Sequence, residues 1–172
     1  MKYFNRKKGS DRMKPDKMAE IYDRNKNTVF RMAFSYCKNK ADAEDLMQDV
    51  FIKLFTCGVE FEDENKERSW LLKVTVNKCR DMFRSLRYRY LLTSIPLDEA
   101  CLTYETPEES EVYHAVMSLP TKYRIVIHLY YYEGYSVKEI SSITGTNESA
   151  VQTQLYRARK KLKDTLGKEL LS

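Results

Sequence analysis

The fold is decided by one stretch near the C-terminus, YSVKEISSITGTNESAVQTQLYRARKKLKDTL at residues 135–166. Ser136, followed three residues later by Glu139, is typical of a helix start, and Gly145 suits the left-handed cap that ends a helix. Thr146 or Asn147 then caps a second helix. The stretch therefore predicts a helix-turn-helix.

The second of these helices has two different faces. Apolar residues recur at steps of three and four on the face that would pack inward: Val151, Leu155, Ala158, Leu162 and Leu166. Polar residues come first on the outer face and cations follow: Ser149, Gln152, Thr153, Tyr156, Arg157, Arg159, Lys160, Lys161 and Lys163. This order is typical of a helix that reads base edges with its N-terminal part and holds phosphates with its later cations. A lysine-rich surface helix is the alternative.

Composition favours an all-helical globular protein. In 172 residues there are only 5 glycines and 4 prolines, and 42% of the residues are hydrophobic. The net charge of +5 is small, but the charge is unevenly spread. Residues 1–17 and 67–93 each carry seven basic and two acidic residues, whereas residues 94–118 carry six acidic residues and no lysine or arginine. Two basic zones flanking an acidic segment suit a polyanion that is held at two places.

Cysteine and histidine give no sign of a metal site or of catalysis. The four cysteines are far apart, and neither histidine is near the other or near a cysteine. Cys37 and Cys79 fall among apolar residues, which predicts small buried side chains. No run approaches the roughly 20 apolar residues of a membrane span. We therefore expect no metal, no cofactor, no enzymatic activity and a cytoplasmic location.

Three helices are predicted in the N-terminal half. The first spans about Asp16 to Lys38, and the second spans Ala41 to about Phe55, with acidic residues in its first turn, where the helix dipole favours anions. Residues 56–66 are predicted to form a loop. A third helix, from about Lys66 to Tyr88, carries a polar stripe opposite its apolar side: Trp70, Lys73, Asn77, Arg80, Arg84 and Arg87. Trp70 on this stripe either stacks on unpaired bases or packs against the first or second helix, and spacing leaves both possibilities open.

The rest of the chain predicts a linker and a second domain. Residues 89–107 lack periodicity, and a short acidic helix capped by Thr106 follows. The next helix opens at Leu119-Pro120 and is apolar nearly all round, which places it at the centre of its domain. We expect two small all-α domains, at residues 17–88 and 108–172, joined by the linker 89–107 and preceded by a flexible basic arm at 1–16.

Segments in both halves of the chain resemble one family, the group IV (extracytoplasmic-function) sigma factors of bacterial RNA polymerase. DAEDLMQDVFIKLF at residues 42–55 is similar to the second conserved helix of that family, and Ser69-Trp70-Leu71 with Asn77 and Arg80 resembles its third. Residues 119–162 resemble its C-terminal domain. The resemblance covers residues 18–166 and implies domains of the sigma region 2 and region 4 types.

The resemblance also implies roles for particular residues. The second helix would dock on the clamp helices of the largest polymerase subunit through Asp45, Gln48, Asp49 and Phe51. The melted minus-ten element would be held by Phe61, Arg68, Trp70, Lys73, Asn77, Arg80, Arg84 and Arg87. The duplex minus-thirty-five element would be read by Ser149, Gln152, Thr153, Tyr156, Arg157, Arg159, Lys160 and Lys163. Further implied partners are the beta flap of the polymerase and an anti-sigma factor, which would hold the chain at the membrane.

Two departures from the family pattern bear on promoter choice. Val76 stands where the family often has arginine, and Gln152-Thr153-Gln154 stands where Lys-Ser-Arg is common. Glutamine can pair with adenine through two hydrogen bonds, so these changes favour direct base readout over phosphate contact. An autonomous helix-turn-helix regulator and a polymerase-binding protein that mimics a sigma factor are the alternative functions.

Overall fold

The computed structural model describes residues 14–85 and 111–169, and all the regular elements in those ranges are helices. The chain divides into two compact units, residues 1–91 (the N-terminal unit) and residues 92–172 (the C-terminal unit). The predicted arm at 1–16 lies mostly outside the described residues, and the predicted linker and the Thr106 cap lie wholly outside them. None of the helices within the described ranges is long and apolar enough to cross a membrane.

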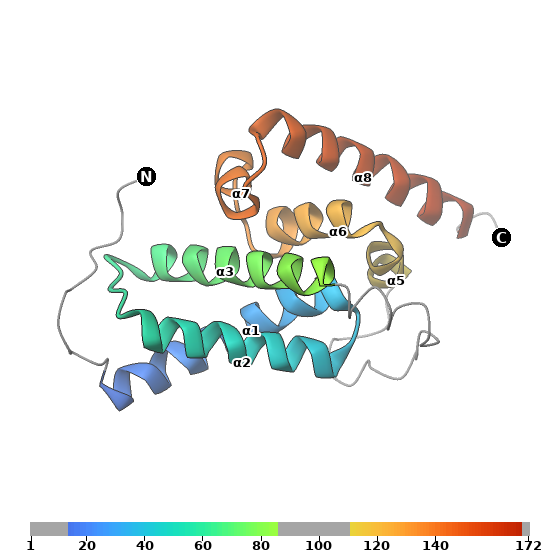
Figure 1. The fold of residues 1–172 in the computed structure, drawn as a ribbon. Helices are drawn as coiled ribbons and strands as arrows, with labels where there is room; N and C mark the ends of the chain where they lie inside the picture. Colours follow the sequence, from blue (N-terminus) through green and yellow to red (C-terminus); the bar gives the residue numbers. More distant parts are fainter. Residues whose placement is uncertain (1–13, 86–110, 170–172) are drawn as a thin grey trace. The chain divides into compact units, whose positions relative to one another are not determined.

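The N-terminal unit consists of α1 (Pro15–Cys37), α2 (Lys40–Cys57) and α3 (Glu64–Arg84). Figure 1 shows α2 and α3 running antiparallel side by side, with α1 crossing behind them. The predicted loop at 56–66 is shorter than expected because α2 continues to Cys57 and α3 begins at Glu64. The carboxylate of Asp63 caps α3 by accepting a hydrogen bond from the backbone N–H of Lys66 at 2.7 Å.

All three helices contribute to one apolar core. It is made of seven buried side chains, each of which contributes about 1.5–3 kcal/mol on full burial: Ile21, Val29, Val50, Phe51, Leu54, Leu71 and Val74. Cys79 is also fully buried, as predicted, whereas Cys37 is only half-buried. This core fixes α2 and α3 relative to each other, so the surface between them has a defined shape.

A buried polar network joins α1 to the start of α3. Glu67 is only 5% exposed, and its Oε1 accepts hydrogen bonds from Arg24 Nη2 at 2.9 Å and from Asn25 Nδ2 at 2.8 Å. A buried carboxylate without partners would be costly, so this pairing sets the register between the two helices. Sequence periodicity did not identify it, because the partners are 42 and 43 residues apart.

The C-terminal unit contains α5 (Glu111–Ser118), α6 (Thr121–Ile127), the π-helical turn η1 (His128–Tyr132), α7 (Val137–Thr144) and α8 (Glu148–Glu169). The helix predicted after Pro120 is therefore α-helical at first and then π-helical. Every residue from Tyr123 to Leu129 is buried, which confirms that this segment is the centre of the unit. The long α8 packs on α5, α6 and α7 (Figure 1).

The centre of this unit also holds a buried cation. Arg124 is 2% exposed, and its Nη1 donates to the backbone oxygens of Met117 at 2.9 Å and Leu119 at 2.8 Å. These carbonyls lie at the C-terminal end of α5, where the helix dipole favours a positive charge. Arg124 thus ties α6 to the end of α5.

The helix-turn-helix is confirmed in detail. Ser136 and Glu139 form a reciprocal capping box at the start of α7, and Gly145 takes the left-handed conformation with a φ of 64° at its end. The side chain of Asn147 accepts a hydrogen bond from the backbone N–H of Ala150 at 2.7 Å, so of the two predicted caps Asn147 is the one used. These local contacts fix the direction in which α8 leaves the turn.

Candidate functional sites

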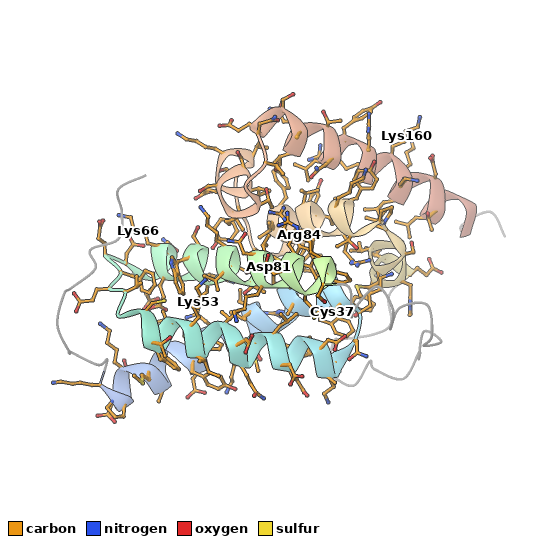
Figure 2. All side chains as sticks on the ribbon, in the orientation of Figure 1. Cys37, Lys53, Lys66, Asp81, Arg84 and Lys160 are labelled. Carbon is orange, nitrogen blue, oxygen red and sulfur yellow. The ribbon has the colours of Figure 1, made fainter. Side chains whose placement is uncertain are left out.

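A polar groove runs between α2 and α3 in the N-terminal unit. Its lining comes from both helices: Asp42, Asp45, Leu46, Gln48, Asp49, Ile52, Lys53, Asn77, Lys78, Asp81 and Met82. Figure 2 labels Lys53 on α2 and Asp81 on α3, one from each wall. With four carboxylates and two ammonium groups, the lining carries a net charge of −2. The groove therefore suits a cationic partner.

The residues predicted to dock on polymerase differ in their contacts within this groove. Asp45 and Gln48 are exposed on its α2 wall. Asp49 is also exposed, but its carboxylate is already paired with Lys78 Nζ of α3 at 2.6 Å. Burial, together with the nearby charge of Asp45, raises the pKa of Asp42 above its ordinary value. The carboxylates are thus crowded enough to favour a positive partner.

Phe51 was wrongly predicted to belong to the exposed docking face. Its side chain is 3% exposed and packs in the core, with its ring edge-on to Tyr22 at a centroid distance of 4.9 Å. Ile52, which is 59% exposed and lines the groove, is the apolar side chain that α2 displays there. The docking roles were implied by resemblance to the family, which does not show whether a side chain is buried, and Phe51 lies on the buried side of α2.

The polar stripe of α3 is partly confirmed as a surface. Lys73, Asn77 and Arg84 are exposed, and Figure 2 labels Arg84 near the end of the helix. Arg80 is half-buried, where its side chain hydrogen-bonds the phenol of Tyr36 on α1. Burial raises the pKa of Tyr36 to about 12, although the nearby Arg80 opposes that rise. Arg87 lies outside the described residues.

Trp70 lies at the edge of this stripe and also packs against the protein. Its indole is half-buried against the core, and its ring centroid lies 5.6 Å from that of Phe61 in a tilted arrangement. Trp70 therefore packs in part against the protein, one of the two possibilities left open by its spacing, because it forms an aromatic pair with Phe61 beside the core. The pair remains partly accessible, so base stacking on it stays a prediction.

Arg68 does not lie on the exposed stripe. Its side chain is half-buried, and its Nη2 donates to the hydroxyl of Thr28 on α1 at 3.1 Å. At two residues before Trp70 it is turned about 200° around the helix, toward the α1 side. Arg68 thus joins α1 to α3, and its contact with the minus-ten element stays a prediction.

The outer face of α8 is displayed as predicted. Its exposed side chains include every residue assigned to duplex reading: Ser149, Gln152, Thr153, Tyr156, Arg157, Arg159, Lys160 and Lys163. Tyr156 is 68% exposed, and Figure 2 shows Lys160 extending outward from the helix. Val151, Leu155 and Ala158 are fully or almost fully buried on the opposite side. The buried face thus packs α8 against the rest of the C-terminal unit, and the opposite face is exposed to solvent.

Arg159 lies at the edge of that outer face and contacts the protein itself. Its Nε donates to the hydroxyl of Tyr131 at 2.9 Å, and its guanidinium carbon lies 5.5 Å from the ring centroid of Tyr130 and 5.7 Å from that of Tyr131. The π-helical turn η1 presents both rings. Arg159 is therefore a poorer candidate for phosphate contact than its neighbours, because binding DNA would compete with these contacts.

No metal site was found in the part of the chain that the structure describes, since no three His, Cys, Asp or Glu side chains there could share an ion. The sequence analysis missed Lys78, which lines the groove between α2 and α3, and Arg124, which ties α6 to the end of α5. The signal for Arg124 was available, because it is the only charged residue in the run from Tyr123 to Leu129. Lys78 had no comparable signal.

Comparisons with known proteins match both units. Residues 21–89 match the family described as Sigma-70 region 2, and residues 109–162 match Sigma-70, region 4. The chain is 30% identical over 148 residues to the RNA polymerase sigma factor SigV of Bacillus subtilis, covering 86% of this chain and 89% of SigV. It is 31% identical to the ECF RNA polymerase sigma factor SigE of Mycolicibacterium smegmatis, covering 87% of this chain and 61% of SigE.

A solved structure agrees. CnrH, in complex with the cytosolic domain of CnrY, is 25% identical, has a TM-score of 0.62 and covers 90% of each chain. The fold and the matches to both regions define this chain as an RNA polymerase sigma factor with regions 2 and 4. The chain belongs to the extracytoplasmic-function group of the sigma-70 family and functions in transcription initiation. Sigma factors are not enzymes.

Proposed function

We propose that this chain binds core RNA polymerase and directs it to promoters by holding a melted minus-ten element and reading a duplex minus-thirty-five element. The observation that carries the proposal is the open face of α8, where polar side chains at the helix start are followed by cations. A helix that is fixed by one apolar face and open on the other can enter a major groove. The chain itself would perform no bond chemistry.

We propose that polymerase docks in the groove between α2 and α3. The net charge of −2 in the groove, the exposed Ile52 and the rigid core beneath α2 suit a cationic helical partner, such as the clamp helices that the family resemblance implies. Asp45 and Gln48 would contact that partner directly. The beta flap would be a second contact, made by the C-terminal unit.

The minus-ten element would lie along α3. Lys73, Asn77 and Arg84 offer cations and an amide to the backbone and bases of a single strand, and the Phe61–Trp70 pair offers an aromatic surface. Each aromatic stack on an unpaired base is worth on the order of 1–3 kcal/mol. Trapping such bases would favour the open promoter.

The proposed organisation keeps the boundaries expected from the sequence, with a region 2 domain at 17–88, a linker at 89–107 and a region 4 domain at 108–172. The chain would act in the cytoplasm. An anti-sigma factor would be its regulator and would hold the chain at the membrane. CnrH, one similar protein of known structure, is in complex with the cytosolic domain of CnrY, which supports a protein partner for this chain.

Reconstitution separates this proposal from the alternatives. The purified chain is mixed with core polymerase, and bound DNA is enriched from a random duplex pool and sequenced. We expect enriched fragments to share two elements at a fixed spacing, and to appear only when both proteins are present. Enrichment by the chain alone would indicate an autonomous regulator. Polymerase binding without any promoter-dependent transcription would indicate a sigma mimic.

A further inference from the structure

A second polar hollow lies in the C-terminal unit, where the start of α6 meets the first turns of α8. Its lining comes from these two helices and the preceding turn: Lys122, Tyr123, Asn147, Ser149, Ala150, Thr153, Gln154 and Arg157. Ser149, Thr153 and Arg157 follow one another at steps of four, so they form a single flank of α8. The hollow therefore borders the side of α8 that carries Gln152 and Thr153.

The charged residues that line this hollow are both cations. Lys122 and Arg157 line it, and no carboxylate is among the lining residues. Lys122 Nζ lies 5.1 Å from the ring centroid of Tyr123. The positive charges of Lys122, Arg157 and Lys161 all act on the phenol of Tyr123. Two cations line this concave surface without a carboxylate among the lining residues, and a third, Lys161, acts on Tyr123, so the hollow suits an anion.

Tyr123 joins the two helices at the centre of this hollow. Its residue is only 7% exposed and lines the hollow beside Arg157. Interaction with the guanidinium of Arg157, helped by the charges of Lys122 and Lys161, lowers the pKa of the Tyr123 phenol. A guanidinium has only donors, so toward Arg157 the phenol oxygen can act only as an acceptor, and the phenol O–H is left to donate to an anion.

We propose that this hollow binds one backbone phosphate of duplex DNA, with Lys122 and Arg157 as its cationic contacts and the Tyr123 hydroxyl as both a donor to the phosphate and the group that positions Arg157. The inference rests on the proposed reading of the duplex by α8, and it adds α6 to that interface. The phosphate would lie at the edge of the DNA major groove whose base edges Gln152 and Thr153 contact. A guanidinium already held by Tyr123 loses less rotamer entropy on binding than a free one.

The test uses holoenzyme reconstituted from core polymerase and the full chain, with a duplex fragment that the wild-type holoenzyme has enriched. Lys122→Ala and Arg157→Ala should each lower the slope of log affinity against log salt by about one, without changing the ranking of DNA sequences. Tyr123→Phe keeps the buried ring. It should weaken binding about twofold to tenfold and leave the slope unchanged, because it removes a neutral donor.

A double-mutant cycle and a modified DNA sharpen the test. In the Arg157→Ala background, Tyr123→Phe should cost clearly less than it does alone, because the hydroxyl no longer positions a guanidinium. Replacing single phosphates by uncharged methylphosphonates should reveal one position at which Lys122→Ala has no further effect. Lys17→Ala, which removes an exposed charge from α1 in the other unit, is the control and should change neither slope nor affinity.

The outcomes separate this inference from the proposed function. If Lys122→Ala and Arg157→Ala leave the slope unchanged while Lys160→Ala still lowers it, the hollow binds no phosphate and duplex reading by α8 stands. If no methylphosphonate position suppresses the Lys122→Ala defect, the inference is likewise overturned. If the wild-type holoenzyme enriches no duplex element, the proposed function and this inference both fail.

Discussion

Reversing the charge of the groove between α2 and α3 should abolish polymerase binding without unfolding the N-terminal unit. Asp45→Arg combined with Asp49→Arg changes the net charge of the lining from −2 to +2. Juxtaposing like charges at an interface costs several kcal/mol. Since each 1.4 kcal/mol is a factor of ten, we expect affinity for core polymerase to fall by at least about 100-fold.

The cost to folding should be much smaller. Asp49 is paired with Lys78, but their side chains are 58% and 29% exposed, and an ion pair at the surface is worth about 0.2–1 kcal/mol. The free energy of unfolding should therefore change by no more than about 1–2 kcal/mol once repulsion from Lys78 is added. Trp70 is the only tryptophan in the chain, so its fluorescence during urea unfolding reports on the N-terminal unit.

Binding is measured by competition with a fluorescently labelled wild-type chain for core polymerase. Glu20→Arg reverses an exposed charge on α1 and serves as the matched control. Lys78→Ala is an informative partner variant, because it releases Asp49 and should leave binding equal or tighter. Unchanged affinity of the double variant, in a protein that unfolds like the wild type, would show that polymerase does not dock in this groove.

Four further predictions concern single side chains. Trp70→Ala should destabilise the N-terminal unit by about 1–3 kcal/mol, since its indole is only half-buried. It should also impair promoter opening more than duplex binding. Normal permanganate reactivity of promoter thymines in the folded variant would show that Trp70 only packs against the protein. Gln152→Ala should change sequence preference, whereas Lys160→Ala should weaken binding to all promoters and lower the salt slope by about one; equal effects on all promoters from both would contradict base reading by Gln152. Arg124→Met should cost about 2–4 kcal/mol in chemical denaturation, because it strands the carbonyls of Met117 and Leu119, and a loss below about 1 kcal/mol would show that the tie to α5 matters little. Glu139→Gln should destabilise the C-terminal unit at pH 7 but not at pH 2. The hydrogen bonds from Ser136 lower the pKa of Glu139, so its stabilisation is present above its ordinary pKa and is lost as the pH falls through the lowered one; melting curves that differ equally at both pH values would refute this.

Local signals in the sequence were reliable because they depend on neighbours in the chain. The capping box of Ser136 and Glu139 and the left-handed Gly145 were predicted, and each involves residues within about one turn of a helix. The predicted stripe of α8 is buried at Val151, Leu155 and Ala158 but only half-buried at Leu162 and Leu166. The display of the α8 surface followed from that stripe, because residues opposite a buried face have to be exposed.

Contacts between helices could not be predicted in the same way. The pairs Asp49–Lys78 and Arg159–Tyr131 join residues 29 and 28 positions apart, and Arg68–Thr28 joins residues 40 apart. Periodicity assigns a residue to a face of its own helix but does not say which residue of another helix it meets. The sequence therefore did not show that Arg68 and Arg159, both predicted to contact DNA, also contact a neighbouring helix or turn.

The central claim is that this chain gives core polymerase its promoter specificity, and run-off transcription in vitro tests it most directly. Core polymerase is supplied with the chain and with a template that carries an enriched promoter. We expect a transcript of defined start that requires the chain, that is lost with Asp45→Arg and Asp49→Arg together and is retained with Glu20→Arg. A transcript that forms equally well without the chain, or no transcript while the chain alone binds the same duplex tightly, would show that the chain does not give polymerase its specificity.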